Sequence, residues 1–454
     1  MKNISKLILT IMIISIIHLL TSCEEFLDEK PNKALIIPKS LSELRSLLDN
    51  TTQVMNSEPA LGEAATDNVL LLPSRLQRLT PLQKNTYIWA KDIYEGGYTS
   101  DWKVPYEQVL YANVVLDELE KFDANQQQQT DWKDLKGSAL FYRAYAYFGL
   151  ARQFCLAYDP QNAENTLGLP IRLVSDVKKE VSRANLKETM DQIIADLVDA
   201  LPLLGDTSPH KTRPSRVAAL AMLSRVYLYM GDFQNAIDFG EQALVIKNTL
   251  LDYNSVDSSP SRPFIGHFEE VLYHSGLLFN SYYFFSSGAS VDPELVNAYH
   301  EDDLRATLFF QDKGDYHSFR GQYTDLVNLF GGLATDEVYL NLAESHARLG
   351  NDSEAKTYIN ALLSKRFKEG TYQETDKTGA ALLEMIMVER RKELLMRGIR
   401  WGDLKRLNLI EGEEITLSRQ LEEGNYTLAP NDSRYAFPIP DDEIALSGIK
   451  QNPR

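Results

Sequence analysis

The sequence contains little cysteine and no excess of basic residues. Cys23 and Cys155 are the only cysteines among 454 residues, so a small disulfide-stapled fold is excluded. Asp and Glu number 64 against 47 Lys and Arg, which gives a formal net charge of -17. Because a surface of this sign repels polyanions, no nucleic-acid partner is expected. Hydrophobic residues make up 44% of the chain, the composition of a folded protein.

Sequence signatures of catalysis are also missing. The chain has no phosphate-binding GxxxxGK[ST] loop, no HExxH, no GxSxG and no CxxC. The six histidines beyond residue 22 include no pair at the i,i+4 spacing of a helical metal site. We therefore expect no catalytic residue, no metal and no cofactor. An all-helical glycoside hydrolase stays open as an alternative, because the separation of two catalytic carboxylates is a three-dimensional quantity.

Long hydrophobic runs are confined to the first residues. A basic start precedes an apolar stretch over residues 7–20, which is shorter than the roughly 20 residues of a transmembrane helix and typical of a secretory signal. The letters LTSC at residues 20–23 resemble the lipobox of bacterial lipoproteins. We therefore predict a signal peptide over residues 1–22, lipidation of Cys23 and attachment to the membrane through that lipid anchor.

Cys155 has no disulfide partner if Cys23 is lipidated. It follows an aromatic-rich helical stretch over residues 141–154, and no His or Asp pattern stands beside it. Free cysteine in such surroundings behaves as a small hydrophobic residue. We therefore expect Cys155 to be buried and not catalytic.

Helical periodicity dominates the chain after residue 40, and the alternation typical of strands is scarce. The segment 251–332 is different, because Ser, Pro, Gly and aromatic residues replace regular periodicity there. It is expected to contain loops, short strands and a short helix capped by Asp292 with Pro293 at its first position. Longer helices are predicted over residues 40–48, 106–122, 135–154, 186–204 and 382–396.

An internal repeat predicts two helix pairs. Ser224, Tyr227, Gly231, Ala236, Gly240 and Ala243 recur in the same spacing as Ala343, His346, Gly350, Ala355, Ile359 and Leu362. This is tetratricopeptide register, in which small residues let two antiparallel helices approach and glycine ends the first helix. The two glycines lie 119 residues apart (350 minus 231). We therefore expect a mainly α fold with interrupted tetratricopeptide helix pairs, packed against a loop-rich lobe, rather than a simple solenoid.

Aromatic residues in loops are the candidates for binding a ligand. An exposed ring stacks on the C–H groups of a sugar, and nearby polar side chains hydrogen-bond its hydroxyls. Trp89, Tyr94 and Tyr98 lie in a Gly-Gly-containing connection, and Asp67 and Asn68 lie in the preceding loop. These five residues are the first candidate site, with Trp89 as a core residue being the alternative.

A second candidate segment contains Tyr282 and Tyr283, followed by Phe284 and Phe285. The small residues that come next favour a loop in which the rings are available to a ligand. The alternative is that these neighbouring rings belong to a half-buried strand.

Four regions of the chain resemble the SusD/RagB family of outer-membrane nutrient-binding lipoproteins. They are CEEFLD at residues 23–28 with Pro31, the helix with Trp102, Tyr106 and Asn113 followed by Arg143 to Arg152, the run from Glu389 to Leu404, and FPIP at residues 437–440 with the final Gln451 to Pro453. Two residues depart from the family pattern: Arg397 stands where Glu is usual, and Gly402 where an aromatic residue is common.

The resemblance implies a SusD-like fold and a function in nutrient uptake. After the signal peptide at 1–22, it implies a SusD-like helical region at 23–230, a ligand-facing insertion at 231–332 and a RagB/SusD C-terminal region at 333–454. Such a protein is a lipoprotein of the outer membrane, exposed on the cell surface. It binds an oligosaccharide, delivers it to a SusC-like TonB-dependent transporter and is not an enzyme. The first aromatic segment lies where sugar-binding relatives place ligand residues.

Other functions stay open beside this one. A RagB-like relative would bind a peptide in place of a glycan. A tetratricopeptide scaffold would bind only protein, through its helical groove.

The charged run near residue 390 is interpreted as structural rather than catalytic. Glu393 and Arg397 form a candidate i,i+4 ion pair, and Arg400 and Asp403 an i,i+3 pair. The prolines of the segment 437–440 favour extended backbone. We expect this segment to lie across the helices as a pinned tail.

Overall fold

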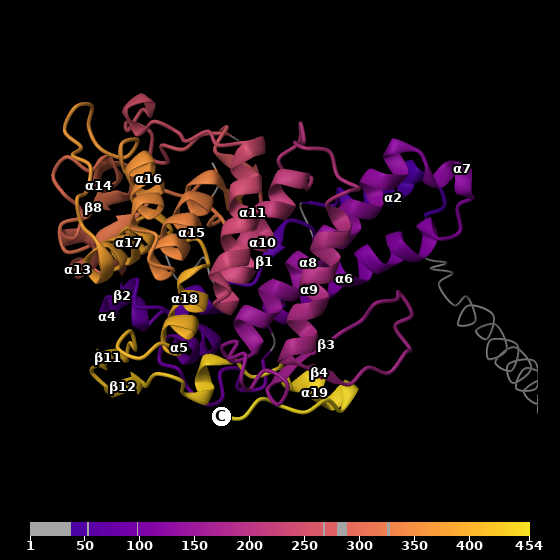
Figure 1. The fold of residues 1–454 in the computed structure, drawn as a ribbon. Coiled ribbons are helices and arrows are strands. Elements are labelled where there is room, and N and C mark those ends of the chain that lie inside the picture. Colours follow the sequence, from indigo (N-terminus) through magenta and orange to yellow (C-terminus); the bar gives the residue numbers. More distant parts are fainter. Residues whose placement is uncertain (1–37, 52–53, 98, 267, 279–287, 325–326) are drawn as a thin grey trace, which may run out of the picture. The chain divides into compact units, whose positions relative to one another are not determined.

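Long helices form the frame of the protein (Figure 1). The computed structural model describes residues 38–454, apart from 52–53, 98, 267, 279–287 and 325–326. Cys23, Tyr98, Tyr282 and Tyr283 therefore lie outside the described residues. Residues Leu41–Arg454 form one compact unit, which contains every described helix and strand.

Helices of eight or more residues carry most of the core, which confirms the mainly α fold. They are α2 (Leu41–Leu48), α6 (Ser100–Leu119), α8 (Thr130–Phe154), α9 (Leu186–Ala200), α10 (Arg216–Met230), α11 (Phe233–Ile246), α15 (Thr335–Arg348), α16 (Asp352–Leu363), α17 (Gly379–Glu393) and α18 (Arg400–Leu407). The shorter helices are α3 (Leu61–Ala65), α4 (Pro73–Leu76), α5 (Pro81–Tyr87), α7 (Ala124–Gln127), α13 (Pro293–Asn297), α14 (Leu304–Phe309) and α19 (Asp441–Ser447), with 3-10 turns η1 (Tyr253–Ser255) and η3 (Ser433–Tyr435).

The described strands are short and pair two by two. β1 (Ser57–Glu58) pairs with β6 (Gly276–Leu277), β2 (Val69–Leu71) with β7 (Ala289–Val291), β3 (Leu167–Pro170) with β4 (Arg183–Asn185), β5 (Val271–Tyr273) with β10 (Leu333–Ala334), β8 (Phe310–Asp312) with β9 (His317–Phe319), and β11 (Leu417–Leu421) with β12 (Gly424–Leu428). The first pair is parallel and the others are antiparallel. Two of these pairs, β1 with β6 and β2 with β7, join the segment 251–332 to residues that precede α6.

The helices expected from periodicity are present, and the differences lie at their ends. Helix α6 begins before Pro105, because the Thr99 side chain accepts a hydrogen bond from the Asp101 backbone N–H at 3.2 Å and caps the first turn. Helix α17 ends three residues before Met396, whose φ of 60° is left-handed and stops the helix. The short helix α13 begins as expected, with the Asp292 side chain accepting from the Glu294 N–H.

Both helix pairs expected from the repeat are present as α10 with α11 and α15 with α16. Gly231 ends α10 with a φ of 77°, and Gly350 follows α15 with a φ of 78°, a conformation that favours glycine. Within the first pair, the Ser224 hydroxyl donates to the Ala236 carbonyl at 2.8 Å. Small residues at these places therefore let the two helices meet closely.

The helices form one continuous array although the sequence interrupts it. Neighbours pack in the order α6, α8, α9, α10, α11, α15 and α16, with α17 also against α15. Helix α11 contacts α15 directly. The chain therefore leaves the array after Ile246, forms the segment 251–332 outside it and returns to the array at Thr335 (Figure 1). A second hydrophobic cluster, with Tyr253, Phe309 and Tyr323 among its members, packs the insertion against residues 60–87 and against Leu395 and Met396.

The C-terminal segment lies across the end of α8, as the FPIP sequence predicts. The Phe437 N–H donates to the Gln153 carbonyl at 2.9 Å, and the Phe437 ring stacks on Trp401 with 5.4 Å between centroids. The Asn452 side-chain amide donates to the carbonyls of Phe154 and Phe437, both at 2.7 Å. The tail is therefore fixed by backbone groups and by a buried ring.

Cys155 is fully buried directly after α8, as expected. Burial raises the pKa of its thiol, which disfavours the reactive thiolate. Among the described helices, none combines the length and the apolar character needed to cross a bilayer.

Gly240 provides a test of the close approach between α11 and α15. A Cβ at this position would lie 2.9 Å from Leu342 Cδ2 and 3.1 Å from the Ser224 hydroxyl. We expect Gly240→Leu to lower the free energy of unfolding by about 1 to 3 kcal/mol, because extra methylenes strain a packed core. Urea denaturation measures this change in the free energy of unfolding. The control is Gln242→Leu, at an exposed position of the same helix. Equal stability of the two variants would contradict the close packing.

Candidate functional site

The Trp89 ring, the first candidate for stacking on a ligand, is buried. It is 1% exposed, and its indole N–H donates to the Ala65 carbonyl at 2.9 Å. The Arg419 guanidinium lies 4.7 Å from the Trp89 ring centroid and 4.5 Å from that of Tyr87. In this conformation Trp89 supports the loop and has no ring face open to solvent.

Tyr94 is also buried, and it ties its loop to the C-terminal tail. Its hydroxyl donates to the Pro438 carbonyl at 2.7 Å, and burial raises its pKa well above the usual value. The three residues that follow, 95–97, are exposed. Tyr94 is therefore the last buried residue before the segment reaches the surface.

Asp67 and Asn68 are engaged with arginines of the C-terminal region. The Asp67 carboxylate accepts two hydrogen bonds from Arg400, at 2.8 and 2.6 Å, and Arg391 lies 3.3 Å away. Although burial opposes ionisation, these guanidinium groups hold the pKa of Asp67 well below its usual range. Asn68 is 1% exposed, and its side-chain oxygen accepts from Arg391 at 3.2 Å. Both side chains thus brace the loop before β2 in this conformation.

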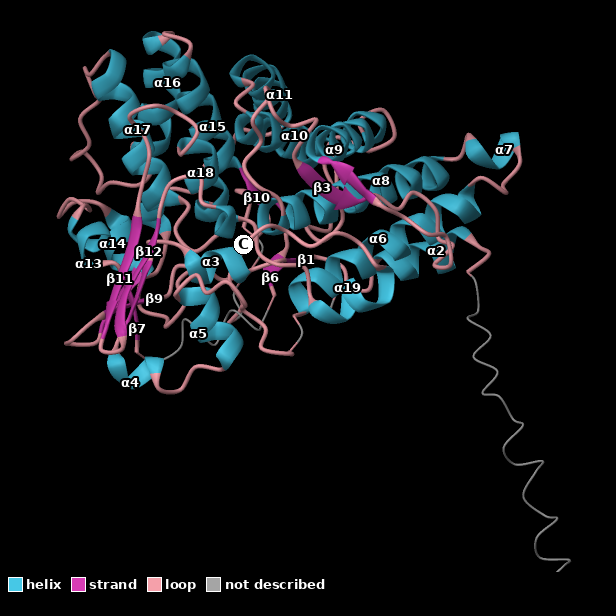
Figure 2. Cartoon of the chain, turned by 90° about the horizontal axis from the view of Figure 1, so that it is seen from below, coloured by secondary structure: helices cyan, strands magenta, loops and turns pink. Residues whose placement is uncertain are grey.

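Two strand pairs join the strands that border the second candidate segment to residues that precede α6. The candidates Tyr282 and Tyr283 belong to the segment between β6 and β7, and those strands pair with β1 and β2. In the second pair Ala289 lies opposite Leu71, and the Leu72 N–H donates to the Gly288 carbonyl at 3.0 Å. Helix α4 follows Leu72 directly, and Figure 2 shows α4 beside β7. In sequence, the segment with Tyr282 and Tyr283 thus lies between two strands that each pair with a residue range preceding α6, whereas α4 and α5 separate β2 from Tyr98.

Gly288 is flanked by two polar side chains that the sequence did not single out. Its N–H donates to the Tyr316 hydroxyl at 3.3 Å, and a Cβ on Gly288 would lie 2.9 Å from Arg75 Cβ. Arg75 and Tyr316 are both half-buried. Burial and the neighbouring charge of Arg78 lower the pKa of Arg75, and its Nε has no hydrogen-bond partner among the described residues. This edge therefore offers a phenol and a guanidinium with spare hydrogen-bonding capacity.

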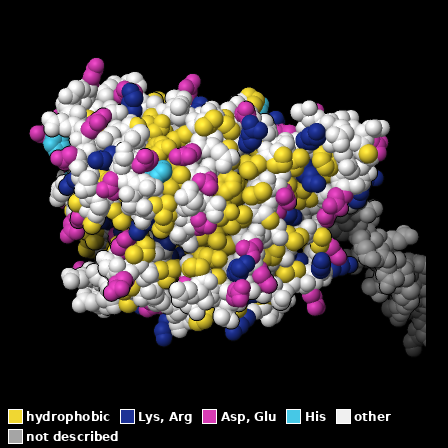
Figure 3. Space-filling view, in the orientation of Figure 1, with side chains coloured by type: hydrophobic (Ala, Val, Ile, Leu, Met, Phe, Trp, Pro, Cys, Tyr) yellow, Lys and Arg dark blue, Asp and Glu magenta, His cyan; other side chains and the backbone are white. Residues whose placement is uncertain are grey.

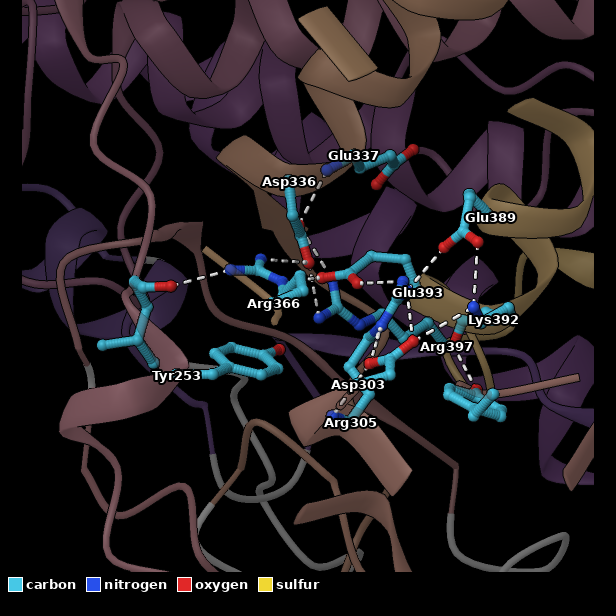
Figure 4. Close-up of polar contacts among 12 residues, drawn as sticks. Tyr253, Asp303, Arg305, Asp336, Glu337, Arg366, Glu389, Lys392, Glu393 and Arg397 are labelled. Atoms are coloured by element: carbon cyan, nitrogen blue, oxygen red, sulfur yellow. Dashed lines mark hydrogen bonds and ion pairs between the residues drawn. The ribbon is translucent and has the colours of Figure 1, made fainter. Parts of the chain in front are cut away.

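The densest set of charges is a buried network that joins the insertion to α17 (Figure 4). Arg305, which has no exposed surface, donates to Asp303 at 2.9 and 2.7 Å, to Glu393 at 2.9 Å and to Glu389 at 2.5 Å. Lys392 adds a second cation, 3.0 Å from Asp303 and 2.8 Å from Glu389. Each charge of the network is balanced by an opposite charge. Removing one member would leave another buried charge without a partner, so the members stabilise one another only together.

A second guanidinium lies among three buried carboxylates. Carboxylate oxygens of Glu270, Asp336 and Glu393 lie within 4.8 Å of one another, a spacing compatible with a metal site. Arg366 donates to Glu270 at 2.6 Å and to Glu393 at 2.7 Å, and it lies 4.0 Å from Asp336. The guanidinium thus stands among these oxygens as their cation, and burial raises the pKa of Glu270. The group is suited to holding the fold together rather than to catalysis.

Aromatic rings of the insertion cover the network. The Arg366 guanidinium lies 4.0 Å from the Tyr253 ring centroid, and that of Arg397 lies 3.9 Å from the Tyr323 centroid. The hydroxyls of Tyr253 and Tyr323 hydrogen-bond to each other. The rings exclude water from one side of the charges, which strengthens the electrostatic attraction.

The structure corrects both ion pairs expected along the charged helix. Arg397 pairs with Asp336 at 2.7 Å rather than with Glu393. Asp403 accepts from Arg390 and Arg406, each at 2.9 Å, rather than from Arg400, whose partner is Asp67. The local spacing was misleading because Arg397 follows the end of α17, so that helical i,i+4 geometry no longer applies. The interpretation of these charges as structural fits their burial.

The sequence alone did not indicate which residues of the insertion and of the segment after α16 take part in this network. Asp303, Arg305 and Arg366 occur in segments where charged residues look like ordinary surface positions. The one usable signal was the helix capped by Asp303, since a carboxylate two residues before an arginine favours an N-cap. The partners of Arg366 lie 27 and 96 residues away in sequence, so no local pattern could identify them.

A groove with apolar walls crosses helices α8, α9, α10 and α11. Its volume is about 910 Å³, and Leu140, Leu220 and Val245 are among its lining residues. Val245 is 86% exposed and Val198 is 41% exposed. Figure 3 shows hydrophobic side chains gathered on the face that carries α10 and α11. Contiguous apolar surface of this kind often marks an interaction site, whereas a single exposed apolar residue does not.

Glu63 in α3 provides a test of burial near the first candidate loop. It is 1% exposed and accepts from the Gly398 N–H at 2.8 Å, and burial raises its pKa from 4.5 to about 7. As the pH rises above 4.5, the Glu63 carboxyl ionises in the unfolded chain but stays protonated in the folded protein. The free energy of unfolding therefore falls by about 3 kcal/mol in total, until the folded group also ionises.

We therefore expect Glu63→Gln to lose this dependence and to be more stable than the natural protein at pH 8. Urea denaturation between pH 4.5 and 8 measures the difference, and Glu180→Gln, at an exposed position, is the control. If the difference between Glu63→Gln and the natural chain did not change with pH, Glu63 would not be buried as described.

Comparisons with known proteins agree on one family. The profile of a family described as "Starch-binding associating with outer membrane" matches residues 25–228, and the profile of the SusD family matches residues 335–454. SusD-like protein P2 of Formosa agariphila is 24% identical, over 94% of this chain and 95% of its own length.

Solved structures of similar fold span nearly the whole chain. A putative sugar binding protein from Bacteroides vulgatus has a TM-score of 0.75 and 23% identity, over 92% of this chain and 99% of its own. A SusD superfamily protein from Bacteroides thetaiotaomicron has a TM-score of 0.75 and 21% identity, over 91% and 100%. The two profile matches together cover more than half of the chain. With its helix array, its insertion and its pinned tail, the chain belongs to the SusD family.

Proposed function

We propose that the protein is a surface-exposed outer-membrane lipoprotein that binds an oligosaccharide and delivers it to a SusC-like TonB-dependent transporter. The lipobox at residues 20–23 supports export and lipidation of Cys23. Family membership and the similar fold of the putative sugar binding protein from Bacteroides vulgatus support a carbohydrate ligand. Binding without bond cleavage follows from this role.

The observation that carries the proposal is the polar edge beside Gly288, which Arg75 and Tyr316 flank. In sequence, residues 73–98 follow β2, and residues 279–287 lie between β6 and β7. We infer that Tyr98, Tyr282 and Tyr283 supply rings to one extended ligand at this edge. Stacking of a ring on a sugar face needs no charge, which suits a neutral glycan.

Arg75 and Tyr316 add polar contacts to the proposed site. Both flank Gly288, at the end of the second aromatic segment. A guanidinium donates hydrogen bonds, and a phenol both donates and accepts, so together they satisfy sugar hydroxyls. We assign a supporting role to Trp89, Tyr94, Asp67 and Asn68, because their side chains are engaged within the protein.

The apolar groove across α8, α9, α10 and α11 is our candidate surface for the transporter. Residues such as Val245 are costly to leave in water, and burying them against a partner is favourable. The groove is formed by long helices of the array, whereas the ladders β1 with β6 and β2 with β7 are formed by other elements. Different elements would then serve ligand binding and docking.

Ligand binding is tested by calorimetry with maltoheptaose and a panel of other neutral oligosaccharides. We expect Tyr98→Ala and Tyr316→Ala to weaken the binding of the active sugar about 10-fold or more, because each ring removed costs about 1 to 2 kcal/mol. Tyr358→Ala, which removes a half-buried ring on α16, is the matched control and is expected to bind normally. Peptide binding without sugar binding would favour a RagB-like role, and hydrolysis abolished by one carboxylate substitution would favour a hydrolase.

Delivery is tested by affinity capture of the tagged full-length lipoprotein from gently solubilised outer membranes. We expect a TonB-dependent barrel in the eluate, and we expect Val245→Glu to reduce its recovery because a charge would enter the apolar groove. Glu301→Ala, at an exposed position of the insertion, is the control. Recovery of scaffold-type partners without a barrel would overturn the uptake role.

A further inference from the structure

A small cavity beside Gly402 has an unusual lining. Arg152, Arg225, Arg390 and Arg406 face it with one acid, Asp403, and with Tyr229. Each of these six side chains belongs to a residue that is at most 7% exposed. Gly402 contributes no side chain, and a Cβ there would lie 3.4 Å from Arg152 Cδ and 3.6 Å from Tyr229 Cδ2. The cavity is thus a buried pocket between α8, α10, α17 and α18.

Three hydrogen-bond donors of the lining have no partner among the described residues. They are the Nε of Arg152, the Nη1 of Arg225 and the hydroxyl of Tyr229. The oxygens of Asp403 already accept from Arg390 and Arg406. A buried donor without an acceptor costs about 1 to 3 kcal/mol, so an acceptor inside the cavity would stabilise the fold. The lining is rich in donors and poor in free acceptors.

The charges around the cavity leave one cation uncompensated. The four lining guanidinium groups are paired with carboxylates: Arg152 with Glu58, Arg225 with Glu337, Arg390 with Asp403, and Arg406 with Glu344. Arg348, which shares Glu344, also pairs with Glu413. Each of these five arginines thus has one carboxylate to match it.

Lys405 is the exception in this region. It is 1% exposed, and its Nζ donates to the carbonyls of Arg152 at 2.8 Å and Cys155 at 2.7 Å. Its Nζ also lies 5.8 Å from the Tyr229 ring centroid, and among the described residues no carboxylate influences its pKa. Burial, with Arg152 as a neighbouring like charge, lowers the pKa of Lys405 to about 7. A negative charge nearby would balance this ammonium.

We propose that the cavity beside Gly402 binds a single monatomic anion of the halide class, with chloride as the natural occupant. The space open to the centre of a water-sized sphere is about 20 Å³, and one water needs about 10 to 15 Å³ on that measure. The cavity therefore holds one small particle. A halide only accepts hydrogen bonds, which suits a lining rich in free donors, whereas a water would also have to donate two hydrogens into a lining with few free acceptors.

The direct test is a bromide soak of crystals of the protein, with anomalous diffraction. The expected result is an anomalous peak in the cavity, within hydrogen-bond distance of Arg225 Nη1 and the Tyr229 hydroxyl. A water-like density without anomalous signal, or an empty cavity, would overturn the proposal.

A solution test uses the natural chain and three variants. Thermal unfolding in sodium chloride or bromide is compared with sodium gluconate at equal ionic strength, and the halides are expected to raise Tm. This rise should disappear in Gly402→Ala, whose methyl group fills the space, and shrink in Tyr229→Phe, which removes one donor. Gly205→Ala, whose Cβ would lie 3.7 Å from the Thr207 carbonyl, is the control and keeps the rise. An equal halide effect in all four proteins would contradict a specific site.

Discussion

A buried guanidinium needs hydrogen-bond acceptors for its N–H groups on every side, and this requirement determines how the parts of the protein are joined. Arg305 and Arg366 have no exposed surface, and their acceptors come from the insertion, α15 and α17 together. Removing one partner of such a group leaves a charge in a medium that solvates it poorly, at a cost of about 3 to 5 kcal/mol. The insertion and the helix array are therefore held in one arrangement by charges that neither could bury alone.

The short strands beside the insertion depend on this arrangement. The ladders β1 with β6 and β2 with β7 contain two and three residues per strand, too few to be stable alone. They need an already fixed insertion, which the ionic network and the rings of Tyr253 and Tyr323 provide. The core thus supplies the rigidity on which these ladders depend.

The sequence predicted features that depend on local patterns and failed where distant residues decide. Periodicity and caps located the long helices, and the glycine spacing located the α10–α11 and α15–α16 pairs, because these signals lie within one or two turns. Whether Trp89 is buried could not be decided from the sequence. The residue that covers its ring, Arg419, lies 330 residues later (419 minus 89), so no local pattern indicates the contact. Arg397 was matched to the wrong acid for the same reason: its real partner, Asp336, lies 61 residues away.

The contact between α11 and α15 has a consequence for the order of folding. Helices α6 to α11 meet their neighbours in the array within short stretches of chain, so they can assemble early by local contacts. Helix α15 can reach α11 only after the intervening insertion has been synthesised, and the partners of Arg305 on α17 follow later still. The apolar side of α11 must stay uncovered until then. Closure of the array is therefore a late, non-local step, and the unfinished chain exposes an apolar surface that is prone to aggregation.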